Sequence, residues 1–375
     1  MSKYFGGIFG NTNPVTANVA GQKGVYTLID QYFSKQEGGW SVGMDASGGT
    51  EVTYNSKKIH IFKATGTFTV NTVGPGSIEY VIIGGGGSGG ANGTNAYGTG
   101  GGGAGQVRTG TSTIASTGGI TVTIGAGGAT AAAENTQGND GANSSAAFPS
   151  GTITGYGGGG GASNGPPSYS NPGRNGVNYP DPVNGSGSGG GAGKGSAGIT
   201  YHGGPSALGA YPGGNGGPQP GMYAGVGGGG AGGAGGDGPT SGGNQPNPNS
   251  EIGYGGLALQ LPSTFQSPDM APTAPAPQQV GTNGPTGNHW VAGGGSGGMY
   301  SNPTPSVTND AKGGGGPGGG GPWGGGGNGG YATSIDGTAA TANTGGGGGG
   351  GGSKVPEGGD GGAGGSGLVL IAYPS

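Results

Sequence analysis

The sequence predicts a mainly β protein with almost no α-helix, in which a β-sandwich-like framework carries a layered bundle of extended glycine-rich helices. Glycine supplies 113 of the 375 residues and is concentrated in long runs. In several runs the other residues recur at every third position, which is the period of the polyproline II helix rather than of an α-helix or a strand. Short apolar segments of the kind that form strands flank these runs.

Two kinds of glycine run predict two positions in the bundle. In 231–238 and 358–367 every third residue carries a side chain, for example Ala231, Ala234 and Asp237. With three residues per turn these side chains form one row, so we expect such helices in an outer layer with the row facing away. Gly345–Gly352 is uninterrupted glycine, smooth on all sides. We expect it in a middle layer, where it would span about 25 Å.

The glycine runs need neighbours in order to be ordered. Fixing the backbone of an eight-residue run costs roughly 8–16 kcal/mol, and glycine lies at the high end. Hydrogen bonds between adjacent helices, worth about 0.5–1.5 kcal/mol each, are the main compensation available without side chains. Solvated disorder is one alternative, although the net charge of −4 is low for a disordered chain. Collagen is rejected because glycine does not stand at every third position, and a silk-like protein fits poorly because strands frame unequal runs.

Strand-forming segments lie on both sides of the glycine-rich body. Three of them, 67–70, 77–83 and 120–124, are alternating or continuously apolar. The fourth, 368–373, stands alone at the far end of the chain and needs partners to bury its faces and pair its amides. We therefore expect it to return to the sheet formed by 59–125.

These observations divide the chain into three parts. Residues 1–58 form an N-terminal attachment segment, and residues 59–130 form the β framework, which the strand 368–373 completes. Residues 131–367 form the glycine-rich bundle with variable loops. The leader contains the densest aromatic and aliphatic group in the chain, which either docks onto a larger assembly or packs as a small subdomain. The candidate attachment residues are Tyr26, Leu28, Tyr32, Phe33 and Trp40.

Composition limits the partners and the compartment. The chain has no cysteine, which excludes disulfides and thiolate metal sites. Eleven basic residues against fifteen acidic ones argue against nucleic acid as a partner. We find no apolar run long enough for a signal peptide or a membrane span, and we expect a protein that is soluble.

The sequence offers little for catalysis, and we expect no enzyme, no cofactor and no metal site. None of the three histidines is spaced with a carboxylate as in a triad, and His60 lies in a predicted strand, where a structural role is expected. The phosphate-loop pattern is absent, and no pair of carboxylates stands out for glycoside hydrolysis. Residues 232–240 approach a calcium nonapeptide, but that motif works in tandem and no second copy adjoins it.

Aromatic residues in the loops favour surface recognition. Tyr and Trp mixed with Asn, Ser and Pro give rigid contact area at low entropic cost. We expect about half of the loop aromatics to cap the glycine layers instead, with Trp323 the foremost cap, and we take loops 162–186 and 239–290 as the variable ones. The receptor-binding candidates are Tyr169, Tyr179, Tyr201, Tyr211, Tyr223, Trp290, Tyr300 and Tyr331.

The junctions between strands and glycine runs resemble the glycine-rich domain of bacteriophage tail-fibre and adhesin proteins, particularly those of marine phages. The leader, with FGGIFGN, GVYTLIDQY and GGW, also looks like such proteins. The segments that carry the resemblance are SIEYVIIGGGGSGG, GGGGAGQVRTGT, ITVTIGAGG and GGSGLVLIAYP. The design is similar to the tail-tip adhesins of T-even-like phages, which stack glycine-rich polyproline II-type helices in layers and bind host surfaces through loops. Those adhesins have no obvious counterpart of the N-terminal β region and leader.

The resemblance implies a virion protein, part of a tail fibre or another external appendage, that attaches to the host cell. Its expected partners are other tail proteins, through the N-terminal segment, and a host glycan or outer-membrane protein, through the loops. Fibres of this kind are often trimers, so a homotrimer is possible. The alternative is a purely structural fibre or decoration protein that binds no receptor.

Overall fold

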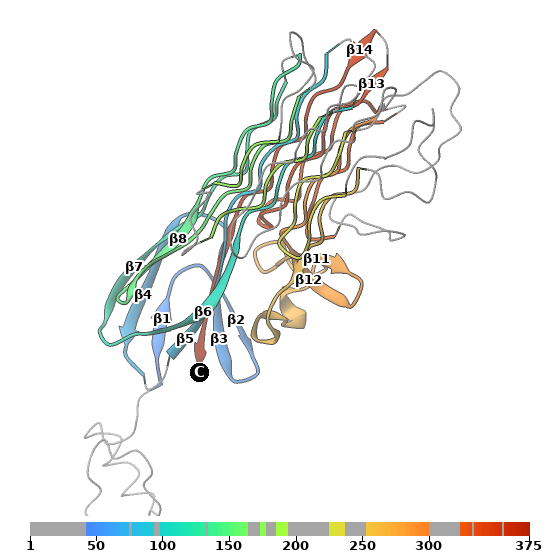
Figure 1. The fold of residues 1–375 in the computed structure, drawn as a ribbon. Coiled ribbons are helices and arrows are strands. Elements are labelled where there is room, and N and C mark those ends of the chain that lie inside the picture. Colours follow the sequence, from blue (N-terminus) through green and yellow to red (C-terminus); the bar gives the residue numbers. More distant parts are fainter. Residues whose placement is uncertain are drawn as a thin grey trace, which may run out of the picture.

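The computed structural model of the chain describes residues 43–74, 77–93, 98–132, 134–163, 173–177, 185–193, 225–236, 253–299, 323–331, 334–354 and 356–375. In these residues the regular structure is antiparallel β, and the helical elements are two three-residue 3₁₀ turns. The predicted mainly β fold with almost no α-helix is confirmed. Figure 1 shows strands gathered at one end and a bundle of extended segments running away from them.

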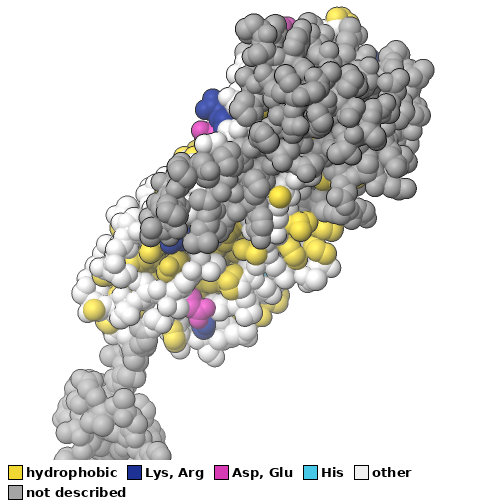
Figure 2. All heavy atoms as spheres, in the orientation of Figure 1, with side chains coloured by type: hydrophobic (Ala, Val, Ile, Leu, Met, Phe, Trp, Pro, Cys, Tyr) yellow, Lys and Arg dark blue, Asp and Glu magenta, His cyan; other side chains and the backbone are white. Residues whose placement is uncertain are grey.

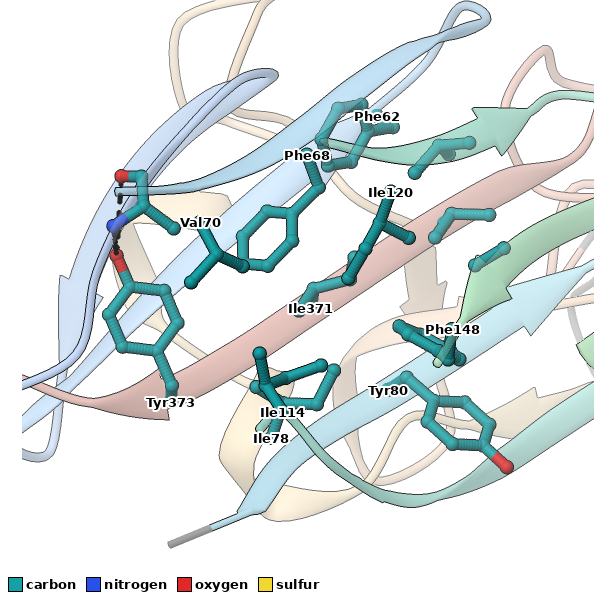
Figure 3. Close-up of a cluster of buried hydrophobic side chains, with 14 of the residues drawn as sticks. Phe62, Phe68, Val70, Ile78, Tyr80, Ile114, Ile120, Phe148, Ile371 and Tyr373 are labelled. Atoms are coloured by element: carbon teal, nitrogen blue, oxygen red, sulfur yellow. Dashed lines mark hydrogen bonds between the residues drawn. The ribbon is translucent and has the colours of Figure 1, made fainter. Parts of the chain in front are cut away.

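Two five-stranded sheets form the framework. The first has the order β1 (Asp45–Ser47), β4 (Gly66–Thr72), β7 (Gly118–Thr123), β8 (Ser144–Phe148), β9 (Gly151–Gly155). The second has the order β2 (Thr50–Tyr54), β3 (Lys57–Phe62), β15 (Leu368–Pro374), β5 (Ser77–Ile83), β6 (Val107–Thr113). Side chains alternate across each strand, and one face of each sheet contributes to a shared core. Figure 3 shows that core, in which Phe68 and Val70 of the first sheet face Ile371 and Tyr373 of the second.

The C-terminal strand returns to the framework. β15 lies between β3 and β5 and pairs with both in antiparallel register, for example Ile371 with His60 and with Tyr80. The expected return of 368–373 is therefore confirmed. It becomes the centre of its sheet, which is why it is apolar on both faces.

The framework begins earlier in the chain than residue 59. β1 and β2 lie within the segment assigned to the leader, and β2 forms a hairpin with β3. Asn55 and Ser56 make the two-residue turn with φ of 47° and 56°, the positive values that such hairpins require. The strand itself was missed because only Val52 in its centre is apolar and buried.

A folded insert covers the outer face of the second sheet. It comprises β10 (Leu259–Gln260), two 3₁₀ turns (Ser263–Phe265 and Pro268–Met270), β11 (Thr282–Gly284) and β12 (Gly287–Val291). The insert contributes buried apolar side chains to a second core with β3, β5 and β15; they are Leu261, Phe265, Met270, Val280 and Val291. This proline-rich stretch, expected to be a variable loop, therefore contains a layer of the framework. Leu257 and Leu259, at the start of the insert, are exposed hydrophobic side chains. Figure 2 shows hydrophobic side chains gathered on one face of the molecule.

The glycine-rich segments, here called rods, continue the strands directly. β5 continues into rod 84–92, and rod 98–106 leads back into β6. β7 continues in the same way into rod 125–131, and rod 359–367 leads into β15. The framework is thus a set of hairpins whose arms extend far beyond the sheets, as Figure 1 shows.

Rod 84–92 shows how the rods are bonded. Beginning at Gly84, every third amide donates to a carbonyl of rod 98–106, at 2.8–3.1 Å. The residues one position further on donate to 136–142, and those two positions further on donate to 359–365. A helix with three residues per turn points successive amides in three directions, so this pattern is that of packed polyglycine II rods. The predicted lateral exchange of amide hydrogen bonds is confirmed for this rod.

The uninterrupted glycine run is at the centre of the bundle. Residues 345–352 are all buried, and a Cβ on Gly348 would lie 2.0 Å from the carbonyl oxygen of Gly362. The prediction of a middle layer is confirmed. The segments that exchange backbone hydrogen bonds with it are 84–92, 98–106, 293–299, 325–331, 335–341 and 359–366.

Rods with a side chain at every third position lie outside. In rod 359–367, Asp360, Ala363 and Ser366 are half-exposed, whereas Gly359, Gly361, Gly362, Gly365 and Gly367 are buried. Ala234 is likewise exposed, and Asp237 lies outside the described residues. The outer-layer prediction therefore holds where the structure describes it.

Candidate binding surface at the distal end of the bundle

The rods have two ends that differ in kind. At the proximal end rods enter the sheets, except that 335–341 and 345–352 join there in the turn 342–345; at the distal end rods join in turns. The described parts of the distal end are 92–93, 131–132, 134–136, 331, 334–335 and the hairpin of β13 (Ser353–Lys354) and β14 (Glu357–Gly358). Figure 1 places this hairpin at the far end of the bundle from the C-terminus.

The distal turns pack on one another. The Gly93 amide donates to Oδ1 of Asn135, at 3.1 Å, and Asn135 holds a φ of 57° in its turn. A Cβ on Gly358 would lie 2.2 Å from the carbonyl oxygen of Gly93, so the hairpin lies directly against this turn. The turns are therefore held in fixed positions relative to one another by the rods and by their own contacts.

A second group of turn residues lies beside the hairpin. Tyr331 and Ser334 exchange two backbone hydrogen bonds, and the Gly352 amide donates to the carbonyl of Ile335 at 2.7 Å. The Asp360 amide donates to a carboxylate oxygen of Asp336 at 2.9 Å. Burial, and then the neighbouring Asp336 carboxylate, raise the pKa of Asp360 above its usual value.

The distal surface is polar and carries both signs of charge. Lys354 and Glu357 are exposed opposite each other in the hairpin, and Glu134 and Asp336 are exposed on other turns of the distal end. Exposed polar groups on rigidly supported turns can recognise a ligand without losing much conformational entropy.

The structure separates the two receptor-binding candidates that it describes. Trp290 lies in β12, immediately before rod 293–299, and Tyr331 lies at the distal end, where the Met299 amide bonds to Gly330. They are therefore at opposite ends of a rod that spans about 22 Å at 3.1 Å per residue. The other candidates, Tyr169, Tyr179, Tyr201, Tyr211, Tyr223 and Tyr300, lie outside the described residues, as do Tyr26, Leu28, Tyr32, Phe33 and Trp40.

Trp290 packs as part of the insert. Its indole ring lies over Gly284, where a Cβ would come within 2.3 Å of the ring. Its Nε1 is buried without a hydrogen-bond partner. A half-buried ring in this position supports the small sheet β10–β12, so Trp290 does not join Tyr331 in one surface. Trp323, expected to be a cap, is half-buried at the proximal start of rod 323–331.

The histidines that the structure describes are structural. His60 is buried in β3 with Nδ1 2.7 Å from the carbonyl oxygen of Gly48, and His289 is buried with Nδ1 3.1 Å from that of Val280. Burial lowers the pKa of both. Within the described ranges, no three His, Asp or Glu side chains gather as metal ligands would. Nor does any helix in those ranges have the length and apolarity to cross a membrane.

The comparison with known proteins identifies the family. A family model described as a glycine-rich domain matches residues 63–274, which is more than half of the chain. The chain belongs to this glycine-rich domain family. The match begins just after β3 and ends within the insert, so β15 and the central rod 345–352 lie beyond it. No curated protein matches the chain.

Sequence reasoning named Tyr331 but missed the β13–β14 hairpin and residues 334–336 as parts of the distal surface. The available signal was position rather than residue type. SKVPEG interrupts two of the longest glycine runs, and a proline-containing interruption between two rods marks a turn. SKVPEG contains no aromatic residue, so aromatic content gave no indication of this turn.

Proposed function

We propose that this glycine-rich chain is an external component of a bacteriophage particle, a tail fibre or adhesin, that attaches to the host cell through its distal surface. The observation that carries the proposal is that the two ends of the molecule differ. The described chain enters at Gly43 beside β1 and ends at Ser375 beside β3, both at the sheet end, while the β13–β14 hairpin and the turns packed against it lie at the opposite end. The resemblance to tail-fibre and adhesin proteins supports the same reading.

Each end of the molecule then has its own partner. The N-terminal segment that precedes Gly43 joins other tail proteins, and the distal surface meets a host glycan or an outer-membrane protein. Flat polar turns with tyrosine nearby suit either partner, because rings stack on sugar faces and amphipathic side chains bind protein surfaces. Rods built of backbone alone keep these turns in place whatever side chains the turns carry.

The test is adsorption of particles that carry altered distal turns. We expect a Lys354→Ala, Glu357→Ala, Tyr331→Ala variant to lower the adsorption rate at least about tenfold, since surface residues that contact a partner often contribute above 1 kcal/mol each. The control removes exposed polar groups from the sandwich, Thr121→Ala with Thr123→Ala, and should adsorb normally.

Two outcomes would contradict the proposal. Unchanged adsorption of the distal variant, with the variant present in particles, would remove the distal surface from receptor binding. Protection of residues 353–358 from a chemical label in the intact particle would show that another virion subunit covers them. The second result would favour the purely structural fibre or decoration protein.

A further inference from the structure

Ala46, in the first strand of the described chain, is tied to the C-terminal strand by a single side chain. The Ala46 amide donates to the Tyr373 hydroxyl at 3.0 Å, and that hydroxyl donates to the Ala46 carbonyl at 3.3 Å. Figure 3 shows both bonds, which cross from β1 of one sheet to β15 of the other. Sheets in a sandwich normally meet through apolar side chains alone, so a hydroxyl that bonds a backbone unit of the facing sheet needs an explanation.

The surroundings of this hydroxyl are buried and closely packed. Tyr373 is 1% exposed. Its ring stacks on His60 at 5.5 Å between centroids, and Nε2 of His60 lies 3.2 Å from the hydroxyl. His60 in turn contacts the carbonyl of Gly48, in the turn between β1 and β2. Tyr373 therefore bonds the central residue of β1, and His60 contacts the residue that follows the strand, both from the opposite sheet.

The other polar side-chain contacts of β1 are made by the exposed Asp45, with Lys58 of β3 at 3.7 Å and with Asn71 of β4 at 3.1 Å. β1 is three residues long, lies at the edge of its sheet and pairs with β4 through an irregular register. It is also the strand through which the chain enters the framework from residue 43. Any tension on the N-terminal segment reaches the protein through this short strand.

A force that pulls the N-terminal segment away from the bundle acts along the axis of β1. β7 leads into rod 125–131 and so points to the distal end; β4 is antiparallel to β7, and β1 is antiparallel to β4. β1 therefore also points to the distal end, and a pull on Gly43 away from the bundle draws it backwards. On the far side of the Tyr373 bonds, β15 continues into rod 359–367 and the β13–β14 hairpin.

We propose that Tyr373 is a mechanical latch, through which tension between the N-terminal attachment and the distal surface passes from β1 to β15 and rod 359–367. The proposal rests on the proposed function for the source of that tension, but not for the existence of the latch. β15 suits this role because it pairs on both sides, with β3 and with β5, and cannot be peeled from an edge.

The test is single-molecule force measurement with cysteine handles, which the absence of native cysteine makes simple. Handles at Gly43→Cys and Lys354→Cys load the latch, whereas handles at Lys354→Cys and Ser375→Cys load β15 directly and bypass it. A Cβ at residue 43 has nothing within 4 Å. The variant is Tyr373→Phe and the matched control is Tyr80→Phe, in the same core beside Phe148 and away from β1 in Figure 3.

We expect Tyr373→Phe to make the first extension step at constant force roughly tenfold faster between residues 43 and 354, as loss of a buried pair of hydrogen bonds implies. The rate between residues 354 and 375 should not change, and Tyr80→Phe should change neither. An equal effect in both geometries would show a general loss of core stability and overturn the latch. No effect in either would also overturn it.

A second measurement does not depend on the folding of the Tyr373 variant. In the protein with its natural core, moving the first handle from residue 43 to Thr53→Cys on β2 places it beyond the latch, and the first short extension step should disappear. Persistence of that step would contradict the proposal. Failure of the proposed function appears separately, as normal adsorption of the distal variants, and leaves these force measurements intact.

Discussion

At the scale of single residues, glycine acts here by what it lacks. In rod 345–352 the space that a Cβ would take is occupied by backbone atoms of a neighbouring rod. A Cβ on Gly347, for example, would lie 1.9 Å from the carbonyl oxygen of Gly102. Backbone cannot move aside as a side chain can, so these positions admit no other residue. Gly345 differs, since its φ of 68° belongs to the turn that starts the rod.

We predict that Gly348→Ala destabilises the protein by at least about 1–3 kcal/mol, the usual cost of overpacking, because both neighbouring backbones are fixed. Thermal unfolding followed by circular dichroism measures the change. Ala363→Ser on the half-exposed outer row and Gly43→Ala in open space are the controls and should unfold like the parent protein. A Gly348→Ala variant as stable as these controls would show that the rods are not in contact.

The two buried histidines predict a dependence of stability on pH. Burial lowers the pKa of His60 and His289 in the folded protein below the ordinary 6.5. The unfolded chain then binds more protons than the folded one just below pH 6.5, so this stability is present above that pH and is lost as the pH falls towards the folded values. Each histidine contributes a slope of at most about 1.4 kcal/mol per pH unit.

Urea unfolding at pH 7.5 and at pH 5.5 tests this prediction. The free energy of unfolding should fall between the two, and a His60→Gln, His289→Gln variant should show a smaller fall. The slope is the informative quantity, because the substitutions also change stability at every pH. An unaltered slope in the double variant would assign the pH dependence to groups other than these two histidines.

At the scale of elements, serine sets how rods align. Ser296 is buried in rod 293–299; its amide donates to Gly327, and its Oγ accepts from the Gly329 amide at 2.6 Å. Ser88 does the same for rod 84–92, accepting from the Asn139 amide at 2.8 Å. In each pair of rods a hydroxyl oxygen replaces a carbonyl as acceptor, and so fixes the register of otherwise featureless segments.

Removal of the hydroxyl should therefore cost stability without changing the shape of the rod. Ser296→Ala leaves the half-buried Gly329 amide without this acceptor, and we expect a loss of about 1–3 kcal/mol. Ser263→Ala, on an exposed position of the insert, is the control and should be neutral. Equilibrium unfolding in urea gives both free energies. Equal stability of the two variants would show that the Ser296 hydroxyl does not stabilise the rods.

The elements also show what could be predicted from sequence. Period-three glycine runs predicted the rods and their layers, because three residues per turn fix where side chains and amides point. The insert escaped prediction because its elements are too short for periodicity and its core residues, such as Phe265 and Met270, are separated by prolines. The separation of Trp290 from Tyr331 depends on which end of a rod each adjoins, and residue type carries no such information.

At the scale of the whole molecule, the order of the chain makes folding depend on its last residues. The central rod 345–352 and the central strand β15 come after most of their partners in sequence. Pairings between segments far apart in sequence form slowly, because the entropic cost of closing the loop comes before the contacts that stabilise the pairing. The glycine-rich family match ends at residue 274, so the part that closes both the sheet and the bundle lies outside it.

The central claim is that glycine segments form packed rods whose amides bond one another laterally. Native-state hydrogen exchange by NMR measures this amide by amide. We predict that the amides of 84–92 and 347–352 exchange only through global unfolding, as slowly as those of β15 in the sheet. Exchange of these glycine amides at the rates of an unfolded peptide, while β15 stays protected, would contradict the account.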